Sequence, residues 1–296
     1  MRACVIFNPA AKGQKAERFR RCLEEIAKEA TLKQTTAPRD ARRLATQAVA
    51  DGFDTIIAAG GDGTLNEVLN GIGDAPEGFQ HTRLGVLPLG TVNVFARELG
   101  LPSQPDKAWQ ILRQGRERRI DLPYFINGEP EAREKIYFAQ LAGAGLDSRA
   151  IELVDWSVKK RIGPLAYVVA GLKAISGPQA RINVSDGIRT VTGELVLVGN
   201  GRKYGGDFRV FPAAKLDSGL LEVCIFPKVN WGVLARCGAR LLLTHQLPPT
   251  GVVRLRGTSF SLIAEATTWF EVDGELAGHL PAQLRILPAG LRVLSP

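Results

Sequence analysis

The residues best suited to chemistry lie in one glycine-rich string, Gly60-Gly61-Asp62-Gly63-Thr64. The string follows Thr55–Ala59, an apolar run that predicts a buried strand. Glycines can adopt φ > 0 and let backbone N–H groups approach a ligand closely. The helix that we expect to begin at about Thr64 attracts phosphate through its first N–H groups and its dipole. Gly60, Gly61, Gly63 and Thr64 are therefore predicted to bind phosphate.

Asp62 is the unusual member of this string, because a carboxylate beside phosphates repels them. Its charge is useful if Asp62 binds Mg²⁺, or a water on Mg²⁺, that bridges to the phosphates of a nucleotide. Asn66 and Glu67 follow in the first turn of the expected helix, where they can bond the loop or the ligand. The string matches neither the Walker A pattern nor the dinucleotide-binding fingerprint. A tight structural turn is the competing interpretation, and the full string GGDGTLNE makes it the weaker one.

A second turn contains Gly90 and Thr91 and follows the next expected strand, Leu84–Leu87. If the two strands are neighbours, both turns lie at the carboxyl edge of one parallel sheet, where doubly wound sheets bind ligands. Thr91 can donate its hydroxyl to a phosphate or sugar oxygen. Asn8 and Thr35 end the other two expected strands, so we expect them at the same edge.

The order of the expected elements predicts two domains. Residues 1–122 alternate short apolar runs with helical patterns, which predicts a doubly wound α/β domain with a parallel sheet and helices on both faces. Residues 123–296 contain mostly strand-like runs, including one over Thr190–Val198, which predicts an antiparallel β-sandwich. Two helical patterns, at residues 164–176 and 231–243, interrupt these runs. A return of the last residues to the first domain is left open.

The composition bounds the partners. The net charge is +8 and the pI about 9.5, which favours anionic partners such as nucleotide phosphates, nucleic acid or an anionic membrane. Lys and Arg are scattered along the chain, so no nucleic-acid partner is predicted. The four cysteines form no CxxC pair, which is typical of a reduced, cytoplasmic protein. The three histidines show no zinc-ligand spacing.

Contact with a membrane is expected to be peripheral, because no apolar run is long enough to span one. Trp156 with Lys159, Lys160 and Arg161 forms a basic run that could meet anionic head groups, although a solvated helix face is the more ordinary interpretation. Residues 231–243 could likewise form an interfacial helix, or pack into a core.

Several segments accompany the two turns in a fixed order. They read FNP at 7–9, GGDGTLNEV at 60–68, LGVLPLGTVN at 84–93, RIDL at 119–122, VGNGRKYGGDFRVFPAA at 198–214, KLDSGLLEV at 215–223 and VDGE at 272–275. Together they resemble the diacylglycerol kinase catalytic family, in particular its bacterial lipid kinase branch. The resemblance implies a first domain similar to NAD kinases and phosphofructokinases. It also implies an enzyme that uses ATP and Mg²⁺ to phosphorylate a hydroxyl of a lipid, such as diacylglycerol or a sphingoid base.

The resemblance also implies roles for single residues. It assigns ATP binding to Thr35, to the loop Gly60–Asn66 with Leu65 included, and to Thr91. It assigns the role of general base to Glu275, which would take the proton of the lipid hydroxyl as that hydroxyl attacks the γ-phosphoryl group. Taken alone, Asp273-Gly274-Glu275 would favour a hairpin turn with an exposed glutamate.

A second metal site is implied by the same resemblance. It would use Asp121, Asp217 and Ser218, with the backbone carbonyls of Lys215 and Leu220. Ser218 departs from the family pattern, which has an acidic residue there, and a hydroxyl is a weaker ligand of Mg²⁺.

Two other functions stay open. An NAD kinase-like enzyme shares the GGDGT string, but Asn200-Gly201-Arg202 replaces the Asn-Glu pair typical of those enzymes. A non-catalytic lipid or nucleotide sensor is disfavoured by Asp62 and Glu275, and Ser218 keeps it open.

Overall fold

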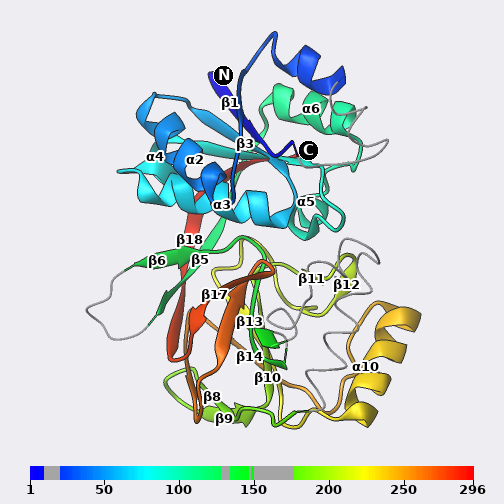
Figure 1. Cartoon of the computed structure of the whole chain (residues 1–296). Coiled ribbons are helices and arrows are strands. Elements are labelled where there is room, and N and C mark those ends of the chain that lie inside the picture. The colour runs from blue at the N-terminus through cyan, green and yellow to red at the C-terminus, as the bar shows by residue number, and fades with distance from the viewer. Residues whose placement is uncertain (10–20, 128–133, 147, 150–176) are drawn as a thin grey trace. The chain divides into compact units, whose positions relative to one another are not determined.

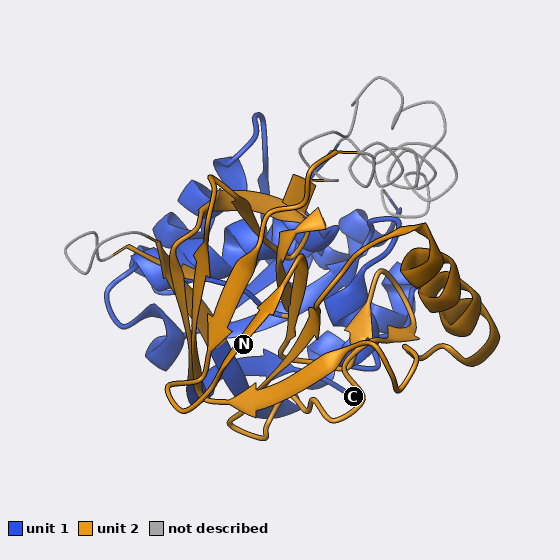
Figure 2. Ribbon diagram, turned by 90° about the horizontal axis from the view of Figure 1, so that it is seen from below, with its two compact units in different colours: residues 1–122, 137–139, 287–296 blue, residues 123–136, 140–286 orange. Residues whose placement is uncertain are grey.

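The computed structural model describes residues 1–9, 21–127, 134–146, 148–149 and 177–296. The chain forms two compact units (Figure 2). Unit 1 comprises Met1–Leu122, Tyr137–Ala139 and Leu287–Pro296, and unit 2 comprises Pro123–Ile136 and Gln140–Ile286. The helical pattern at 164–176 and the basic run at 156–161 lie outside the described residues.

Unit 1 is built on a parallel sheet. Its strands are β1 (Ala3–Phe7), β2 (Thr31–Gln34), β3 (Thr55–Gly60) and β4 (Arg83–Pro88), in the order β2-β1-β3-β4, and the end of β18 (Ala282–Leu294) lies beside β4 (Figure 1). Phe7 pairs with Ala59, and Gly60 pairs with Pro88, so neighbouring strands end together. The strand order reverses between β1 and β3, which is where sheets of this kind bind ligands.

Helices cover both faces of this sheet. They are α2 (Asp40–Ala50), α3 (Asp62–Asp74), α4 (Gly78–His81), α5 (Val94–Glu98) and α6 (Pro105–Gln114), and residues 21–26 are also helical. On one face, Val5, Ile57 and Leu87 form a buried cluster with Trp109 of α6. On the other face α2 and α3 lie side by side (Figure 1), and they approach so closely that a Cβ on Gly71 would meet the Arg42 carbonyl oxygen at 2.1 Å. The predicted doubly wound α/β fold is confirmed.

Unit 2 consists mainly of antiparallel strands. One sheet has the order β14-β13-β10-β7-β16-β17, and a second set runs β18-β15-β8-β9. The strands within unit 2 are β7 (Leu141–Gly145), β8 (Ile182–Ser185), β9 (Thr190–Gly193), β10 (Leu195–Gly199), β11 (Lys203–Tyr204), β12 (Phe208–Arg209), β13 (Leu221–Phe226), β14 (Val253–Gly257), β15 (Ser259–Ala264), β16 (Trp269–Val272) and β17 (Glu275–His279). Further strands lie partly in each unit: β5 (Glu117–Asn127), β6 (Lys135–Tyr137) and β18. Helix α10 (Trp231–Thr244) packs on this unit's core. The predicted antiparallel sandwich is confirmed.

The single strand predicted over Thr190–Val198 is wrong. The structure divides it into β9 and β10, which belong to different sheets. The break is at Glu194, whose N–H donates to the Phe226 carbonyl at 2.9 Å and whose carboxylate accepts from the Val229 N–H at 2.6 Å. An apolar run shows that strands are buried, but it does not show that the chain changes sheet.

Among the described helices, none is both long enough and apolar enough to cross a bilayer.

Candidate active site

The glycine-rich string forms the junction of β3 and α3. Gly60 is the last residue of β3, and Gly61 caps the helix with an extended backbone (φ −93°, ψ −172°). The helix begins at Asp62, two residues earlier than predicted, so Asp62 lies in its first turn. The Leu65 N–H donates to the Gly61 carbonyl at 3.1 Å. The N–H groups of Gly63 and Thr64 precede this bond and have no acceptor within the helix, as phosphate binding requires.

The glycines of the string serve close packing. The prediction that Gly60, Gly61 and Gly63 use positive φ is wrong, because none of the three adopts it. Instead, a Cβ on Gly60 would lie 2.4 Å from the Thr64 hydroxyl oxygen, and a Cβ on Gly90 would lie 2.5 Å from the Gly61 Cα. The Gly60 carbonyl also accepts hydrogen bonds from the N–H groups of Leu89 (2.9 Å) and Gly90 (3.2 Å). The two turns therefore pack backbone against backbone.

The second turn is held by Asn93, which the sequence analysis did not assign. Its side-chain oxygen accepts from the Gly90 N–H at 3.0 Å, and its amide donates to the Gly90 carbonyl at 2.7 Å. Asn93 has φ 53°, a conformation that asparagine tolerates better than most residues, so its position after a Gly-Thr turn was an available signal. Thr91 is exposed at the outside of this turn. An Asp62 carboxylate oxygen accepts from the Phe95 N–H at 3.5 Å and so links the two turns.

Asn8 and Thr35 lie at the same edge of the sheet. The Asn8 N–H donates to the Ala59 carbonyl at 3.3 Å, next to the glycine loop. The Thr35 N–H and hydroxyl lie 3.0 and 3.4 Å from the Phe7 carbonyl oxygen. Asn8 is exposed, whereas Thr35 is buried. The structure thus brings these two residues to the edge that carries the glycine loop and Thr91.

Glu67 and Asn66 bond the scaffold of unit 1. The two carboxylate oxygens of Glu67 accept from the N–H groups of Arg39 (3.1 Å) and Ala41 (3.0 Å), at the start of α2. The Asn66 side chain donates to the Tyr137 carbonyl at 3.3 Å. Buried Asn70 donates to the same carbonyl at 2.9 Å and accepts from the Tyr137 N–H at 2.8 Å. No local sequence pattern predicts this role of Asn70, because its partner lies 67 residues away.

Glu275 belongs to unit 2, where it begins β17 and is exposed. Asp273 (φ 48°) and Gly274 (φ 88°) join β16 to β17, and Val272 pairs with Glu275. Positive φ at both central residues makes this a type I′ turn. The Asp273 carboxylate accepts from the N–H groups of Gln140 (3.0 Å) and Leu141 (3.1 Å), which fixes the hairpin on β7. The hairpin expected from these residues alone is therefore present, and it carries Glu275 at a fixed point.

The residues that the resemblance assigns to a second metal have other partners in each unit. In unit 1, a carboxylate oxygen of buried Asp121 accepts from the Ala289 N–H at 2.9 Å. In unit 2, the Ser218 hydroxyl lies 3.0 Å from the Lys215 carbonyl oxygen and 3.2 Å from the Leu220 carbonyl oxygen. Among the described residues, no three His, Cys, Asp or Glu side chains are grouped to hold a metal ion.

The two candidate Mg²⁺ sites differ in their donors. Asp62 supplies a half-buried carboxylate beside amides that suit phosphate. Mg²⁺ is commonly held by one or two carboxylates, substrate phosphates and waters, so the residues at the glycine loop fit this ion. The loop of residues 215–220 offers one carboxylate, that of exposed Asp217, and its Ser218 hydroxyl is bonded to the Lys215 and Leu220 carbonyl oxygens.

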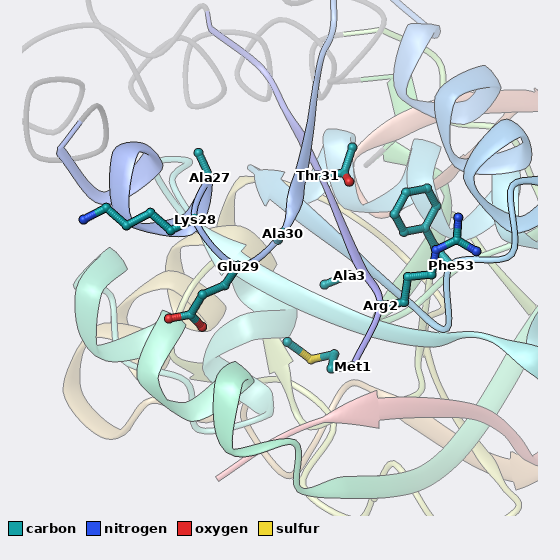
Figure 3. A pocket seen from close by; sticks show the side chains of 9 residues that line it. All are labelled: Met1, Arg2, Ala3, Ala27, Lys28, Glu29, Ala30, Thr31 and Phe53. Carbon is teal, nitrogen blue, oxygen red and sulfur yellow. The ribbon is translucent and has the colours of Figure 1, made fainter.

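The described hollow on unit 1 is not at the glycine loop. It has a volume of about 450 Å³ and is lined by Met1–Ala3, Ala27–Thr31 and Phe53 (Figure 3). These residues lie where β1, β2 and β3 begin, at the opposite end of the strands from the glycine loop. The donors at the carboxyl edge, and not the size of a hollow, identify the candidate site.

Comparison with known proteins agrees with this architecture. Residues 2–124 match the diacylglycerol kinase catalytic domain, and residues 140–295 match the YegS C-terminal NAD kinase beta sandwich-like domain. A diacylglycerol kinase from Staphylococcus epidermidis is 32% identical over 309 aligned residues that cover 100% of this chain and 92% of the relative.

Two solved structures show the same fold. A diacylglycerol kinase from Bacillus anthracis superposes with a TM-score of 0.78 at 21% identity, covering 100% of this chain and 97% of the other. The yeast NADH kinase, solved with NADH, has a TM-score of 0.59 at 9% identity and covers 100% of this chain and 84% of the other. The matched domains and the identity along the whole chain show that the protein belongs to the diacylglycerol kinase family.

Proposed function

We propose that the protein is an ATP-dependent lipid kinase that phosphorylates a hydroxyl group of a diacylglycerol-like or sphingoid lipid. The observation that carries this proposal is the carboxyl edge of the unit 1 sheet. There, two interlocked turns present the amides of Gly63 and Thr64 and the carboxylate of Asp62. A lipid acceptor is supported by the relatives named diacylglycerol kinase.

The reaction is one substitution at phosphorus. The lipid hydroxyl oxygen forms a bond to the γ-phosphorus of ATP, the bond from that phosphorus to the bridging β–γ oxygen breaks, and ADP leaves. In this proposal Glu275 takes the hydroxyl proton, which suits an exposed carboxylate on a rigid hairpin. The amides of Gly63 and Thr64, with the Thr91 hydroxyl, hold phosphate oxygens. Mg²⁺, held by Asp62, would neutralise charge on the transferring group.

The proposed roles of the other residues follow from their contacts. Asn8 and Thr35 border the same edge and would line the nucleotide site, with Leu65 packed beneath it. Glu67 caps α2 and Asn66 holds Tyr137, so these two would act by positioning the loop.

The test is transfer of labelled γ-phosphate from ATP to three acceptors: diacylglycerol, sphingosine and NAD. We expect label in one of the two lipids and none in NAD. Label in NAD alone would favour the NAD kinase-like alternative, and no label in any acceptor would favour the sensor. In either case the proposed function would be wrong.

Two variants test the assigned residues. Asp62→Asn and Glu275→Gln should each lower kcat by on the order of 100-fold or more, because each removes a group that acts on the transferring phosphoryl or the proton. Asp51→Asn is the control for Asp62→Asn, because it removes a surface carboxylate of unit 1. Glu265→Gln is likewise the control for Glu275→Gln in unit 2. Equal activity of a site variant and its control would overturn the assignment of that residue.

A further inference from the structure

The helix α10 of unit 2 has apolar residues on both of its faces. Its inner face is anchored by buried Cys237, with Val233, Leu234 and Leu241 packed against the core cluster. Its outer face carries three large apolar side chains in solvent: Trp231 is 54% exposed, Leu242 74% and Leu243 82%.

The rest of the outer face does not offset this exposure. Residues three, four or eleven positions apart share a helix face, so Ala235 and Ala239 lie with Trp231 and Leu242. Arg236 and Arg240, one turn apart, border this face, and α10 contains no acidic residue. A helix at a protein surface normally presents polar residues to water. The outer face of α10 therefore has the composition of a face that is covered in use.

We propose that the outer face of α10 docks the protein on an anionic lipid bilayer. This inference rests on the proposed function, because a diacylglycerol-like acceptor resides in the bilayer. A helix that lies in the membrane interface combines apolar and aromatic residues on one side with basic residues beside them. Trp231, Leu242 and Leu243 provide the apolar contact, and Arg236 and Arg240 meet the lipid phosphates.

The arginines are placed for this contact. The Arg236 guanidinium donates to the Thr250 carbonyl at 3.2 Å, which holds its charge beside the helix, and both arginines are exposed. A second copy of the chain fits the face less well. A stable protein interface takes roughly 20–30 residues from each side, and one face of this 14-residue helix supplies far fewer.

The test measures binding to vesicles without nucleotide. Vesicles of equal parts phosphatidylcholine and phosphatidylglycerol are sedimented with wild-type protein and with the double variant Leu242→Ser/Leu243→Ser. We expect the affinity of the double variant for these vesicles to be lower by about tenfold or more, because two large apolar contacts are lost. The control is Ile188→Ser, since Ile188 is 96% exposed on the turn between β8 and β9 of the same unit. Ile188→Ser should bind as the wild type does.

The charge is tested with Arg240→Gln, which should weaken binding to the mixed vesicles and leave weak binding to pure phosphatidylcholine unchanged. Thermal unfolding of each variant establishes that it is folded. Unchanged vesicle binding by the folded double variant would overturn the proposal. So would a wild-type dimer that this variant converts to a monomer, because the face would then bind a second copy.

The outcome is separable from that of the proposed function. A short-chain diacylglycerol dissolved below its aggregation limit needs no contact with a membrane. If α10 serves only to bind the bilayer, the double variant should phosphorylate this substrate as fast as the wild type does. Absence of all lipid phosphorylation, together with vesicle binding that is lost in the double variant, would refute the kinase and retain the docking surface.

Discussion

The contact between Gly61 and Gly90 leaves no room for a side chain where the two turns of the candidate site meet. We expect Gly90→Ala to destabilise the protein by about 1–3 kcal/mol, since its Cβ would lie 2.5 Å from the Gly61 Cα and 2.8 Å from the Asn93 side-chain oxygen. Gly238 in α10 is the matched control. A Cβ there meets nothing within 4 Å, so Gly238→Ala should stabilise the helix by about 0.5–1 kcal/mol. Urea unfolding measures both changes, and a neutral Gly90→Ala would show that the two turns can separate.

Asp54 gives unit 1 a measurable dependence on pH. Burial raises the pKa of its carboxyl group, but hydrogen bonds from the Thr55 hydroxyl, the Arg2 N–H and the Arg83 guanidinium outweigh burial and lower the pKa from 3.8 to about 2. The ionised form is favoured in the folded state, so its stabilising contribution is present above pH 3.8 and disappears as the pH falls toward about 2. The change should be under about 1 kcal/mol, because the side chain is 45% exposed.

The measurement is the free energy of unfolding in urea at several pH values between about 2 and 3.8. In Asp54→Asn this free energy should fall less steeply as the pH is lowered, because the contribution of Asp54 is absent. An identical slope in the variant would mean that other carboxyl groups account for the whole dependence.

Single residues were predictable from sequence where they end a strand. Asn8, Thr35 and Thr91 follow strands whose carboxyl ends meet, so their shared edge could be inferred from strand order. Asn70 and Glu67 bond partners 67 and 28 residues away, and no local pattern carries that information. The glycines of the loop were correctly identified as important, but for the wrong reason. The sequence suggested positive φ angles, whereas in the structure a position such as Gly60 needs glycine because a Cβ would meet neighbouring atoms.

At the scale of elements, α3 does two jobs at once. Its first turn faces the candidate phosphate site, and Glu67, about one turn further along, caps α2 through two N–H groups. We expect Glu67→Ala to cost about 1–2 kcal/mol, because both bonds to the start of α2 are lost. Glu67→Gln keeps one acceptor oxygen and should cost less. Urea unfolding measures both costs, and a cost near zero for Glu67→Ala would mean that the cap contributes little.

Strands with a continuous apolar pattern were predicted well. Strands that pass from one sheet or unit to another were not. The strands β1, β3 and β4 follow continuous apolar runs. The strand β5 was not predicted, since it begins with the charged residues Glu117–Arg119 and contains Pro123. The division of Thr190–Val198 depends on the bonds of Glu194, which become visible only when the strand's neighbours are known.

At the scale of the whole molecule, unit 1 is assembled from three separate stretches of chain. Val293 pairs with Leu84, Leu294 lies in a buried cluster, and Asn70 holds Tyr137 at both of its backbone groups. We expect a fragment of residues 1–122 to show no cooperative thermal transition, because it lacks both later stretches. The complete chain is the control, and its near-ultraviolet circular dichroism should show a sharp transition. A fragment that unfolds as sharply as the complete chain would contradict this expectation.

The sequence indicated a change of architecture near Asp121 and left the path of the last residues open. That limit is physical. The alternation of apolar and polar residues in a strand reports which side is buried, and Ala282–Leu294 would show the same alternation beside any sheet.

The return of β18 has a consequence for synthesis. A ribosome releases residues 287–296 only after every residue of unit 2. Until then the nascent unit 1 exposes the edge of β4 that β18 will cover. Unpaired strand edges invite association with other chains. While residues 123–286 are being translated, this edge of β4 is therefore open to pairing with another chain.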